Sequence, residues 1–99
     1  MTTAEQLLQY CEEGDVVRVE EALKSGVDVN SAGVDGMTAL MHASSSGHSE
    51  VVKCLLDRGA DSSLADEDGD TALTHAKINS RHEVESLLRS RGVAIVLQI

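Results

Sequence analysis

The chain of 99 residues contains no proline, tryptophan or phenylalanine, and Tyr10 is its only aromatic residue. It therefore lacks the large aromatic side chains that anchor many protein interfaces. It also lacks the flat rings on which single-stranded nucleic-acid bases stack. These absences argue against a nucleic-acid-binding module and leave the core to aliphatic side chains.

Positive charge is also scarce, since 8 Lys and Arg stand against 17 Asp and Glu, giving a net charge of −9. Phosphate backbones and anionic membrane surfaces would be repelled by such a protein. We therefore expect neither nucleic acid nor a membrane as a partner. A protein or peptide with a basic patch fits better, although an acidic surface can also serve solubility alone.

Cysteine is rare, and Cys11 and Cys54 follow no metal-binding spacing. The strongest apolar run, residues 93–97, is too short to cross a bilayer. The start of the sequence has neither the basic residues nor the apolar stretch of a signal peptide. We therefore expect free thiols in a reducing compartment, the cytoplasm or the nucleus.

What the sequence does contain is an internal repeat with a period of 33 residues. The segment TALMHAS at residues 38–44 returns as TALTHAK at residues 71–77. The same spacing relates Gly36 to Gly69, Val51 to Val84, and the glycines at 26, 59 and 92. The chain is predicted to be a single domain, residues 1–99, with units at about 1–33, 34–66 and 67–99.

The middle unit predicts two short helices. Thr38 is suited to cap the first helix, and Gly47 is suited to end it. The second helix would end near Gly59 and bury a stripe formed by Val51, Val52, Cys54, Leu55 and Leu56. One such pair cannot bury its own apolar face, whereas about three stacked units can.

The segment DGMTALMHASSSGHSEVVKCLLDRGAD, residues 35–61, resembles an ankyrin repeat, whose pattern is DG-x-TPLH-x-AA-x-x-GH-x-EVV-x-LLL-x-x-GAD. Residues 68–92 match more loosely, and residues 7–30 resemble the usual opening repeat. The resemblance implies an all-α solenoid of stacked helix-turn-helix units with β-hairpin fingers between them. It further implies a non-catalytic protein-interaction module of the scaffold or adaptor kind, with no cofactor and no metal.

Some positions depart from the ankyrin pattern. Met41 and Thr74 stand where the family's histidine ties neighbouring units together, which puts that hydrogen-bond network in question. Ser80 replaces the helix-ending glycine, and we expect a remodelled turn because a non-glycine residue in the left-handed region costs about 1 kcal/mol. Lys77 and Ser86 would give the last unit the polar outer face of a C-terminal cap.

The residue types that carry chemistry form no recognised catalytic or metal motif. His42 and His75 occupy equivalent places on neighbouring helices with no evident third ligand, so we predict that they pack between units. The serines at 44–46 are expected to cap a helix end or face solvent. Cys11 and Cys54 are expected to be buried, unreactive thiols.

In ankyrin proteins, recognition uses the finger tips and the exposed ends of the inner helices. The residues of this chain at those places are Glu12, Glu13, Val34, Asp35, Met37, Ser45, Ser46, Glu67, Asp68, Asp70, Ile78 and Asn79. Because this set contains acids and no Lys or Arg, we predict a concave face that binds a basic segment, with Met37 and Ile78 as apolar contacts. The alternative is a targeting or regulatory fragment of a larger protein, which could be an enzyme.

Two segments leave alternatives open. The apolar tail, residues 93–99, has four interpretations. It packs back on the last unit of a monomer, or it forms a contact between two chains. Alternatively, residues 97–99 serve as a ligand for a PDZ domain, or the tail is foreign to the native sequence. Residues 23–30, LKSGVDVN, resemble the ankyrin stretch that asparaginyl hydroxylases accept, with Asn30 as acceptor. The other interpretation of Asn30 is a turn residue that makes local hydrogen bonds.

Overall fold

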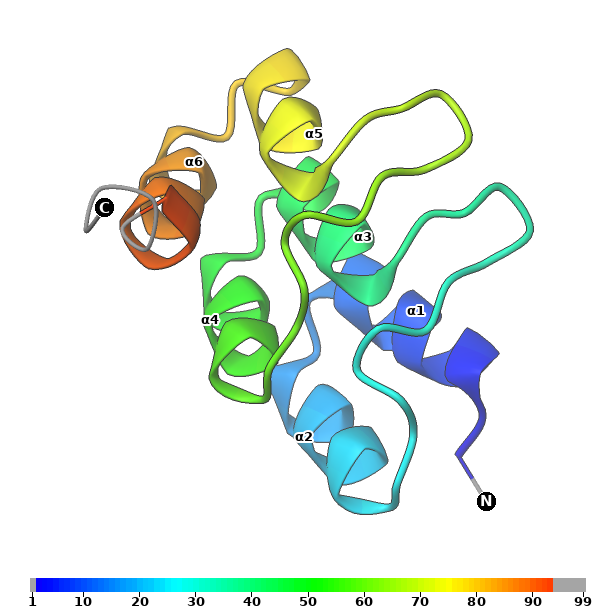
Figure 1. Ribbon diagram of the computed structural model, residues 1–99. Helices are drawn as coiled ribbons and strands as arrows, with labels where there is room; N and C mark the ends of the chain where they lie inside the picture. Colours follow the sequence, from blue (N-terminus) through cyan, green and yellow to red (C-terminus); the bar gives the residue numbers. More distant parts are fainter. Residues whose placement is uncertain (1, 94–99) are drawn as a thin grey trace.

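The computed structural model describes residues 2–93, so the predictions for residues 94–99 lie outside the described part of the chain. Within it, α-helices are stacked in pairs (Figure 1), which confirms the all-α fold. The helices are α1 (Ala4–Glu13), α2 (Val16–Lys24), α3 (Ala39–Ser46), α4 (Ser49–Asp57), α5 (Ala72–Ile78) and α6 (His82–Leu88), followed by the π-helical turn η1 (Arg89–Val93). None of the described helices is long and apolar enough to span a membrane.

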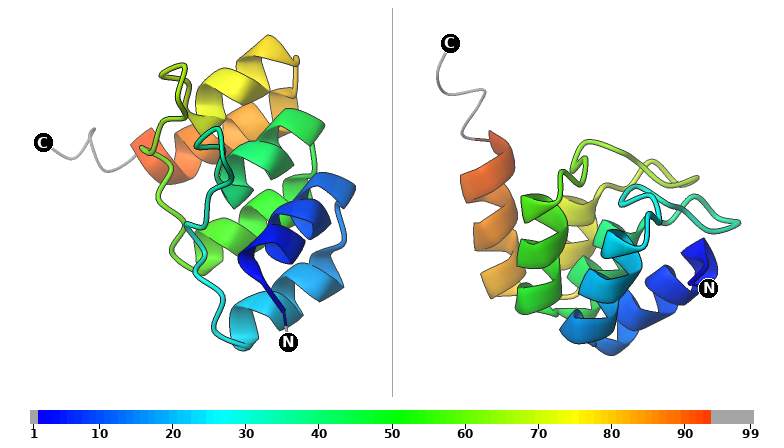
Figure 2. Two further views of the ribbon diagram at one scale, coloured as in Figure 1. Left: turned by 90° about the vertical axis from the view of Figure 1, so that its right-hand side faces the viewer. Right: turned by 90° about the horizontal axis from the view of Figure 1, so that it is seen from below.

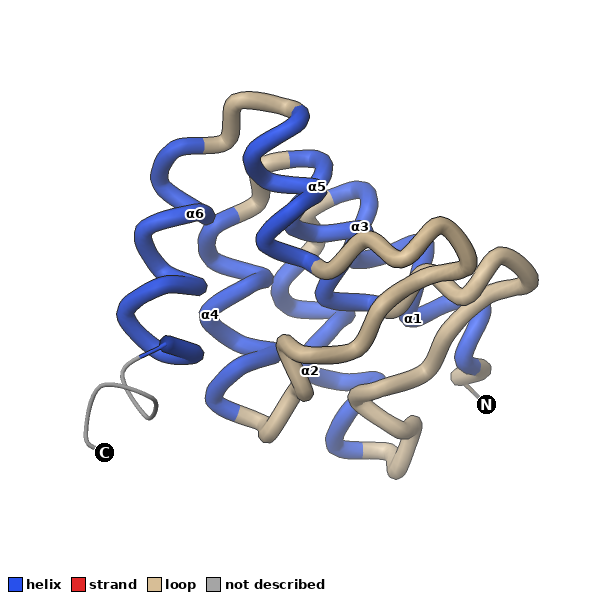
Figure 3. The backbone as a smooth tube through the Cα atoms, turned by 45° about the horizontal axis from the view of Figure 1, so that its top comes forward, coloured by secondary structure: helices blue, strands red, loops and turns tan. Residues whose placement is uncertain are grey.

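The helices form two layers, with α1, α3 and α5 in an inner layer and α2, α4 and α6 in an outer layer (Figures 1 and 2). Each helix contacts its counterpart in the next pair, and we call each pair a unit. Two loops, finger 1 (residues 31–38) and finger 2 (residues 64–71), project side by side beyond the inner layer (Figure 3). Instead of the expected hairpin strands, the described residues hold one isolated antiparallel bridge, between Ala32 and Thr38.

Threonines begin the inner helices. Thr3, Thr38 and Thr71 each accept a hydrogen bond from the backbone N–H three residues ahead, which confirms the predicted cap at Thr38. Where the family has histidine, Met41 accepts a hydrogen bond from the Thr38 N–H through its sulfur, at 3.4 Å. At the equivalent place, the Thr74 hydroxyl lies 3.2 Å from that of Thr71. The family's histidine is therefore replaced by local bonds at each helix start.

Two longer side chains tie the units together instead. Nε2 of His48 donates to the backbone carbonyl of Glu12, at 2.9 Å, and so joins the start of α4 to the end of α1. One unit later, Nε of Arg81 donates to the carbonyl of Ser45 at 3.0 Å. Since these carbonyls lie at helix ends, where no intrahelical partner is present, the bonds also satisfy the helix termini.

Glycine at the end of an inner helix permits a left-handed backbone conformation and leaves room for a neighbouring side chain. Gly14 and Gly47 have φ of 79° and 77°, a region in which residues with a Cβ are strained. A Cβ on Gly14 would lie 2.7 Å from Nδ1 of His48, and a Cβ on Gly47 would lie 2.7 Å from Cδ of Arg81. Ser80 takes φ of 57°, so the turn that we expected to be remodelled keeps the left-handed conformation.

The outer helix α4 buries Val51, Val52 and Leu55 as predicted, whereas Cys54 and Leu56 are only half-buried. Ser44 differs from the expectation that it caps a helix end or faces solvent, because it is fully buried and its hydroxyl has no hydrogen-bond partner. It lies on α3, whose neighbours on either side are α1 and α5. A buried hydroxyl without a partner lowers stability.

We predict that Gly14→Ala destabilises the protein more than Gly59→Ala. Gly59 has φ of 88°, but nothing lies within 4 Å of the position that a Cβ would take, so alanine there should cost about 1 kcal/mol through backbone strain alone. At Gly14 the His48 ring must also leave its carbonyl partner, which adds about 1 kcal/mol. Urea unfolding of both variants measures the difference, and equal losses would contradict the role given to His48.

Ser44→Ala should raise the free energy of unfolding by about 1 kcal/mol, because it removes a buried polar group that has no partner. Ser45→Ala is the matched control. Its hydroxyl accepts a hydrogen bond from Nδ2 of Asn79 at 3.1 Å, so its removal should bring no gain. A loss of stability in Ser44→Ala would show that the hydroxyl has a stabilising partner.

Candidate functional site

The predicted binding residues lie on the fingers and at the ends of the inner helices. Val34 and Ile78 are the most exposed of them among the large hydrophobic residues, with relative exposures of 102% and 67%. Also exposed are Glu12, Glu13, Asp35, Glu67, Asp68 and Asn79, whereas Met37, Ser45, Ser46 and Asp70 are half-buried. Met37 packs against the core, which leaves less of it for a partner than we expected.

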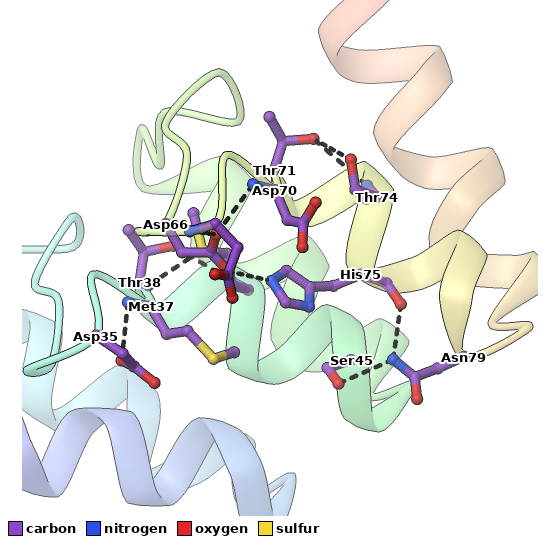
Figure 4. Close-up of polar contacts among 12 residues, drawn as sticks. Asp35, Met37, Thr38, Ser45, Asp66, Asp70, Thr71, Thr74, His75 and Asn79 are labelled. Carbon is purple, nitrogen blue, oxygen red and sulfur yellow. Dashed lines mark hydrogen bonds and ion pairs between the residues drawn. The ribbon is translucent and has the colours of Figure 1, made fainter.

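Two of these residues, Ser45 and Asn79, are hydrogen-bonded to each other between the neighbouring inner helices α3 and α5. Nδ2 of Asn79 donates to the hydroxyl of Ser45 at 3.1 Å and to the carbonyl of His75 at 2.8 Å (Figure 4). The end of α5 is thereby linked to the end of α3. This part of the predicted face is consequently held in one arrangement.

Finger 2 is anchored to α5 through a carboxylate that the sequence analysis did not single out. Oδ1 of Asp66 accepts hydrogen bonds from the N–H groups of Asp68, at 3.0 Å, and Asp70, at 2.9 Å. Nε2 of His75 donates to Oδ2 of Asp66 at 2.8 Å (Figure 4). The Asp66 side chain is only 5% exposed. His75 therefore holds the finger before its own helix, a role that the prediction of packing between units did not include.

These bonds act on the titration of Asp66. The N–H of Asp70 has the largest effect, followed by His75, and together they hold the pKa of the Asp66 carboxyl below its ordinary value of 3.8. Hydrogen bonds donated to a carboxylate favour its charged form. Asp66 is thus an ionised anchor at neutral pH.

Finger 1 has the same backbone pattern but lacks this anchor. The N–H of Gly33 donates to the carbonyl of Met37 at 3.0 Å, just as the N–H of Asp66 donates to the carbonyl of Asp70 at 2.9 Å. Gly33 therefore stands where finger 2 has Asp66. With no carboxylate at this point of the finger, the inner-helix histidine of this unit has a different partner.

That histidine, His42, reaches the preceding unit. Its Nδ1 lies 3.6 Å from Oε2 of Glu12 on α1, and its side chain is 22% exposed. The contact agrees with the prediction that His42 lies between units.

An open hollow of about 710 Å³ lies between α1 and finger 1. It is lined by Glu5, Leu8, Gln9, Glu12, Ala32, Gly33, Val34, Asp35 and His42. Of these, Glu12, Val34 and Asp35 belong to the binding residues predicted from the sequence. Comparison of equivalent positions at the period of 33 residues would have drawn attention to Gly33, because its counterpart is Asp66.

The sequence matches the family model for ankyrin repeats, in three copies, over residues 7–98. The chain belongs to the ankyrin-repeat family. Ankyrin repeats in general mediate protein–protein interactions and are not catalytic. The resemblance stated from the sequence is therefore confirmed.

The curated relatives match over part of the chain. Serine/threonine-protein kinase 12 of Arabidopsis thaliana is 40% identical over 53 residues, which are 54% of this chain and 12% of the kinase. Ankyrin repeat, SAM and basic leucine zipper domain-containing protein 1 is 49% identical over 45 residues in both Nomascus leucogenys and Equus caballus, covering 46% of this chain and 10% of the relative. The chain thus spans only about a tenth of the length of these relatives.

The ankyrin finger 2 also brings metal-ligand types together. Donor atoms of Asp66, Asp70 and His75 lie within 4.8 Å of one another. Both Asp66 oxygens already accept hydrogen bonds from backbone N–H groups and from His75. Anchoring of the finger accounts for this arrangement, and nothing further points to a ligand there.

The two thiols of this ankyrin chain are poor nucleophiles. Cys11 is fully buried, and burial, with a smaller effect of Cys54, raises the pKa of the Cys11 thiol from 9.0 to about 12. Burial also raises the pKa of the half-buried Cys54. Since the thiolate is the reactive form, neither side chain is prepared for nucleophilic chemistry at neutral pH.

Asn30 makes more than a local turn. Its N–H donates to Oδ1 of Asp28 at 2.9 Å, while its own Oδ1 accepts from the N–H of Asp61, one unit away, at 2.8 Å. The side chain thus joins equivalent turns of successive ankyrin units. Hydroxylation at Asn30 stays a prediction.

We predict that the stabilising effect of Asp66 disappears in acid. Because the folded-state pKa of Asp66 is lowered, its contribution is present above pH 3.8 and is lost as the pH falls through the folded value. Wild type and Asp66→Asn should be compared by urea unfolding at pH 7 and pH 3. The wild type should be the more stable at pH 7, with a smaller gap at pH 3. A gap that stays constant would contradict an ionised anchor.

Proposed function

We propose that this chain is a non-catalytic binding module that holds a basic segment of a protein partner along its concave face. The concave face consists of the two fingers and the inner helices α1, α3 and α5. The observation that supports the proposal is that five acids at the end of α1 and on the two fingers are exposed: Glu12, Glu13, Asp35, Glu67 and Asp68. A cationic partner would meet complementary charge along its length.

The charges within the chain support this assignment. Three arginines pair with acids on or beside the outer helices: Arg18 with Asp15, Arg89 with Glu85, and Arg91 with Asp57. Among residues 2–93, no Lys or Arg forms an ion pair with Asp35, Glu67 or Asp68. The positive charge of the chain is thus partly engaged on the outer layer, and a partner would supply it on the concave face.

The fingers offer a firm platform for such a partner. The N–H of Glu67 on finger 2 donates to the carbonyl of Asp35 on finger 1, at 3.1 Å. Asp66 and His75 fix finger 2 on α5, so finger 1 is held indirectly as well. A surface that is ordered before binding loses less conformational entropy when the partner arrives.

The second candidate function is a targeting or regulatory segment of a larger protein. It is favoured by the relatives, in which the matched repeats make up 12% of a kinase and 10% of a multidomain protein. In that setting the bound basic segment would belong either to another part of the same protein or to a separate one. Both functions use the same concave face.

Charge reversal tests the proposed face. We expect Glu67→Lys to slow association with the partner by about fivefold and to weaken its dependence on salt, because charges at an interface rim mainly steer encounter. The matched control is Glu21→Lys, an exposed acid on the outer helix α2 with the same change in charge. Proteins captured from cell extract by the wild-type chain should be purified and their association rates measured at two salt concentrations. Equal rates for both variants would remove the concave face from the proposal.

A further inference from the structure

We infer that the hollow between α1 and finger 1 receives the cationic side chain of a Lys or Arg from the partner, and that Gly33 keeps this hollow open. The inference rests on the proposed function, because it assigns one contact within the concave face. It concerns finger 1 alone. At the equivalent place of finger 2, the Asp66 carboxylate is hydrogen-bonded to His75.

The two fingers share a backbone pattern but differ in the side chain at one position. Gly33 and Asp66 hold the same place in the same backbone pattern, since the carbonyl of each also accepts from the glycine three residues ahead, Gly36 at 3.0 Å and Gly69 at 2.9 Å. In finger 2 the Asp66 carboxylate extends from this place to the inner helix and meets His75 (Figure 4). In finger 1 nothing extends from it, and the hollow of about 710 Å³ lies beside it.

The hollow is lined by several acidic side chains. Its lining includes the carboxylates of Glu5, Glu12 and Asp35 and no Lys or Arg. His42 is the lining residue that can become positive, and it already lies 3.6 Å from Glu12. An ammonium or guanidinium group would be attracted by carboxylates on both walls, and each hydrogen bond to a carboxylate would be charge-assisted.

Part of the lining of the hollow is apolar. Leu8 forms part of the lining and is 8% exposed, while Val34 on the finger is fully exposed. Lys and Arg bury an aliphatic stem while their charged ends remain among polar groups. A hollow with apolar and acidic walls therefore matches a long cationic side chain better than a free inorganic cation.

Gly33 is open to substitution, which makes the hollow testable. It is absent from the glycines with positive φ among the described residues. A Cβ built on it would lie 3.5 Å from Cδ1 of Leu8 and 3.7 Å from Oδ1 of Asp35, which are ordinary contacts. A side chain at this position should therefore fill space without straining the backbone.

The test is a titration of the isotope-labelled chain with N-acetyl-arginine amide, followed by amide chemical shifts in NMR spectra. N-acetyl-citrulline amide, which has nearly the same shape and no charge, is the control probe. We expect the arginine probe to shift the amides of residues 32–36 and of His42. The citrulline probe should leave them in place, and equal shifts from both probes would overturn the inference.

Variants separate charge from space. The double variant Glu5→Gln with Glu12→Gln removes charge and should weaken binding of the arginine probe by about threefold or more. Gly33→Asn adds the volume of the Asp66 side chain without its charge and should weaken binding by a similar factor. Glu21→Gln changes one charge on the outer helix α2 and should leave the shifts near finger 1 unchanged. Dispersed amide spectra will establish that each variant is folded.

Gly33→Ala completes the series, because it adds only a methyl group and should keep most of the binding. If Gly33→Asn binds the probe as wild type does, the hollow is not the site. That result would leave the charge-reversal test at Glu67 untouched, so the concave face would stand without the hollow. Conversely, localised binding at the hollow with no effect of Glu67→Lys on the partner would remove the concave-face proposal and keep a cation site at finger 1.

Discussion

The contact between successive helix pairs is the interaction on which the rest of the molecule depends. A pair of short helices cannot bury its apolar face alone, so the core exists only where units meet. Equivalent positions show this directly: Leu40, in the middle unit, is buried, whereas Leu73, in the last unit, is half-buried. Ser44 is likewise buried, and Lys77 at the same place is exposed. Burial follows from having a neighbour and not from the residue type alone.

Successive units are also joined by hydrogen bonds at the ends of their inner helices. The carbonyls at the ends of α1 and α3 need donors, and His48 and Arg81 supply them from the following unit. Both side chains must pass over the helix end, and glycine at that point leaves the space. Ser80 follows α5 in the last unit of the described residues, so no side chain from a further described unit passes over it. A serine is tolerated there in the left-handed conformation despite its strain.

Features that repeat could be predicted from the sequence, and features that depend on one particular contact could not. The caps at Thr38 and Thr71, the helix ends near Gly47 and Gly59, and the buried stripe of α4 all follow from period and local chemistry. The different partners of His42 and His75 do not, although the two residues occupy equivalent positions. They differ because one finger carries a carboxylate and the other a glycine. The period alone predicts neither the direction nor the length of that contact.

The two fingers consequently have different physical roles. Finger 2 is closed onto its helix by Asp66 and His75, and it passes this order to finger 1 through the backbone bond from Glu67 to Asp35. Finger 1 keeps an open space beside it, with carboxylates around that space. A closed finger thus supports an open one, and the open one can remain ordered without filling its own hollow. Since binding to an ordered surface loses less entropy, the site proposed beside Gly33 would bind its partner at little conformational cost.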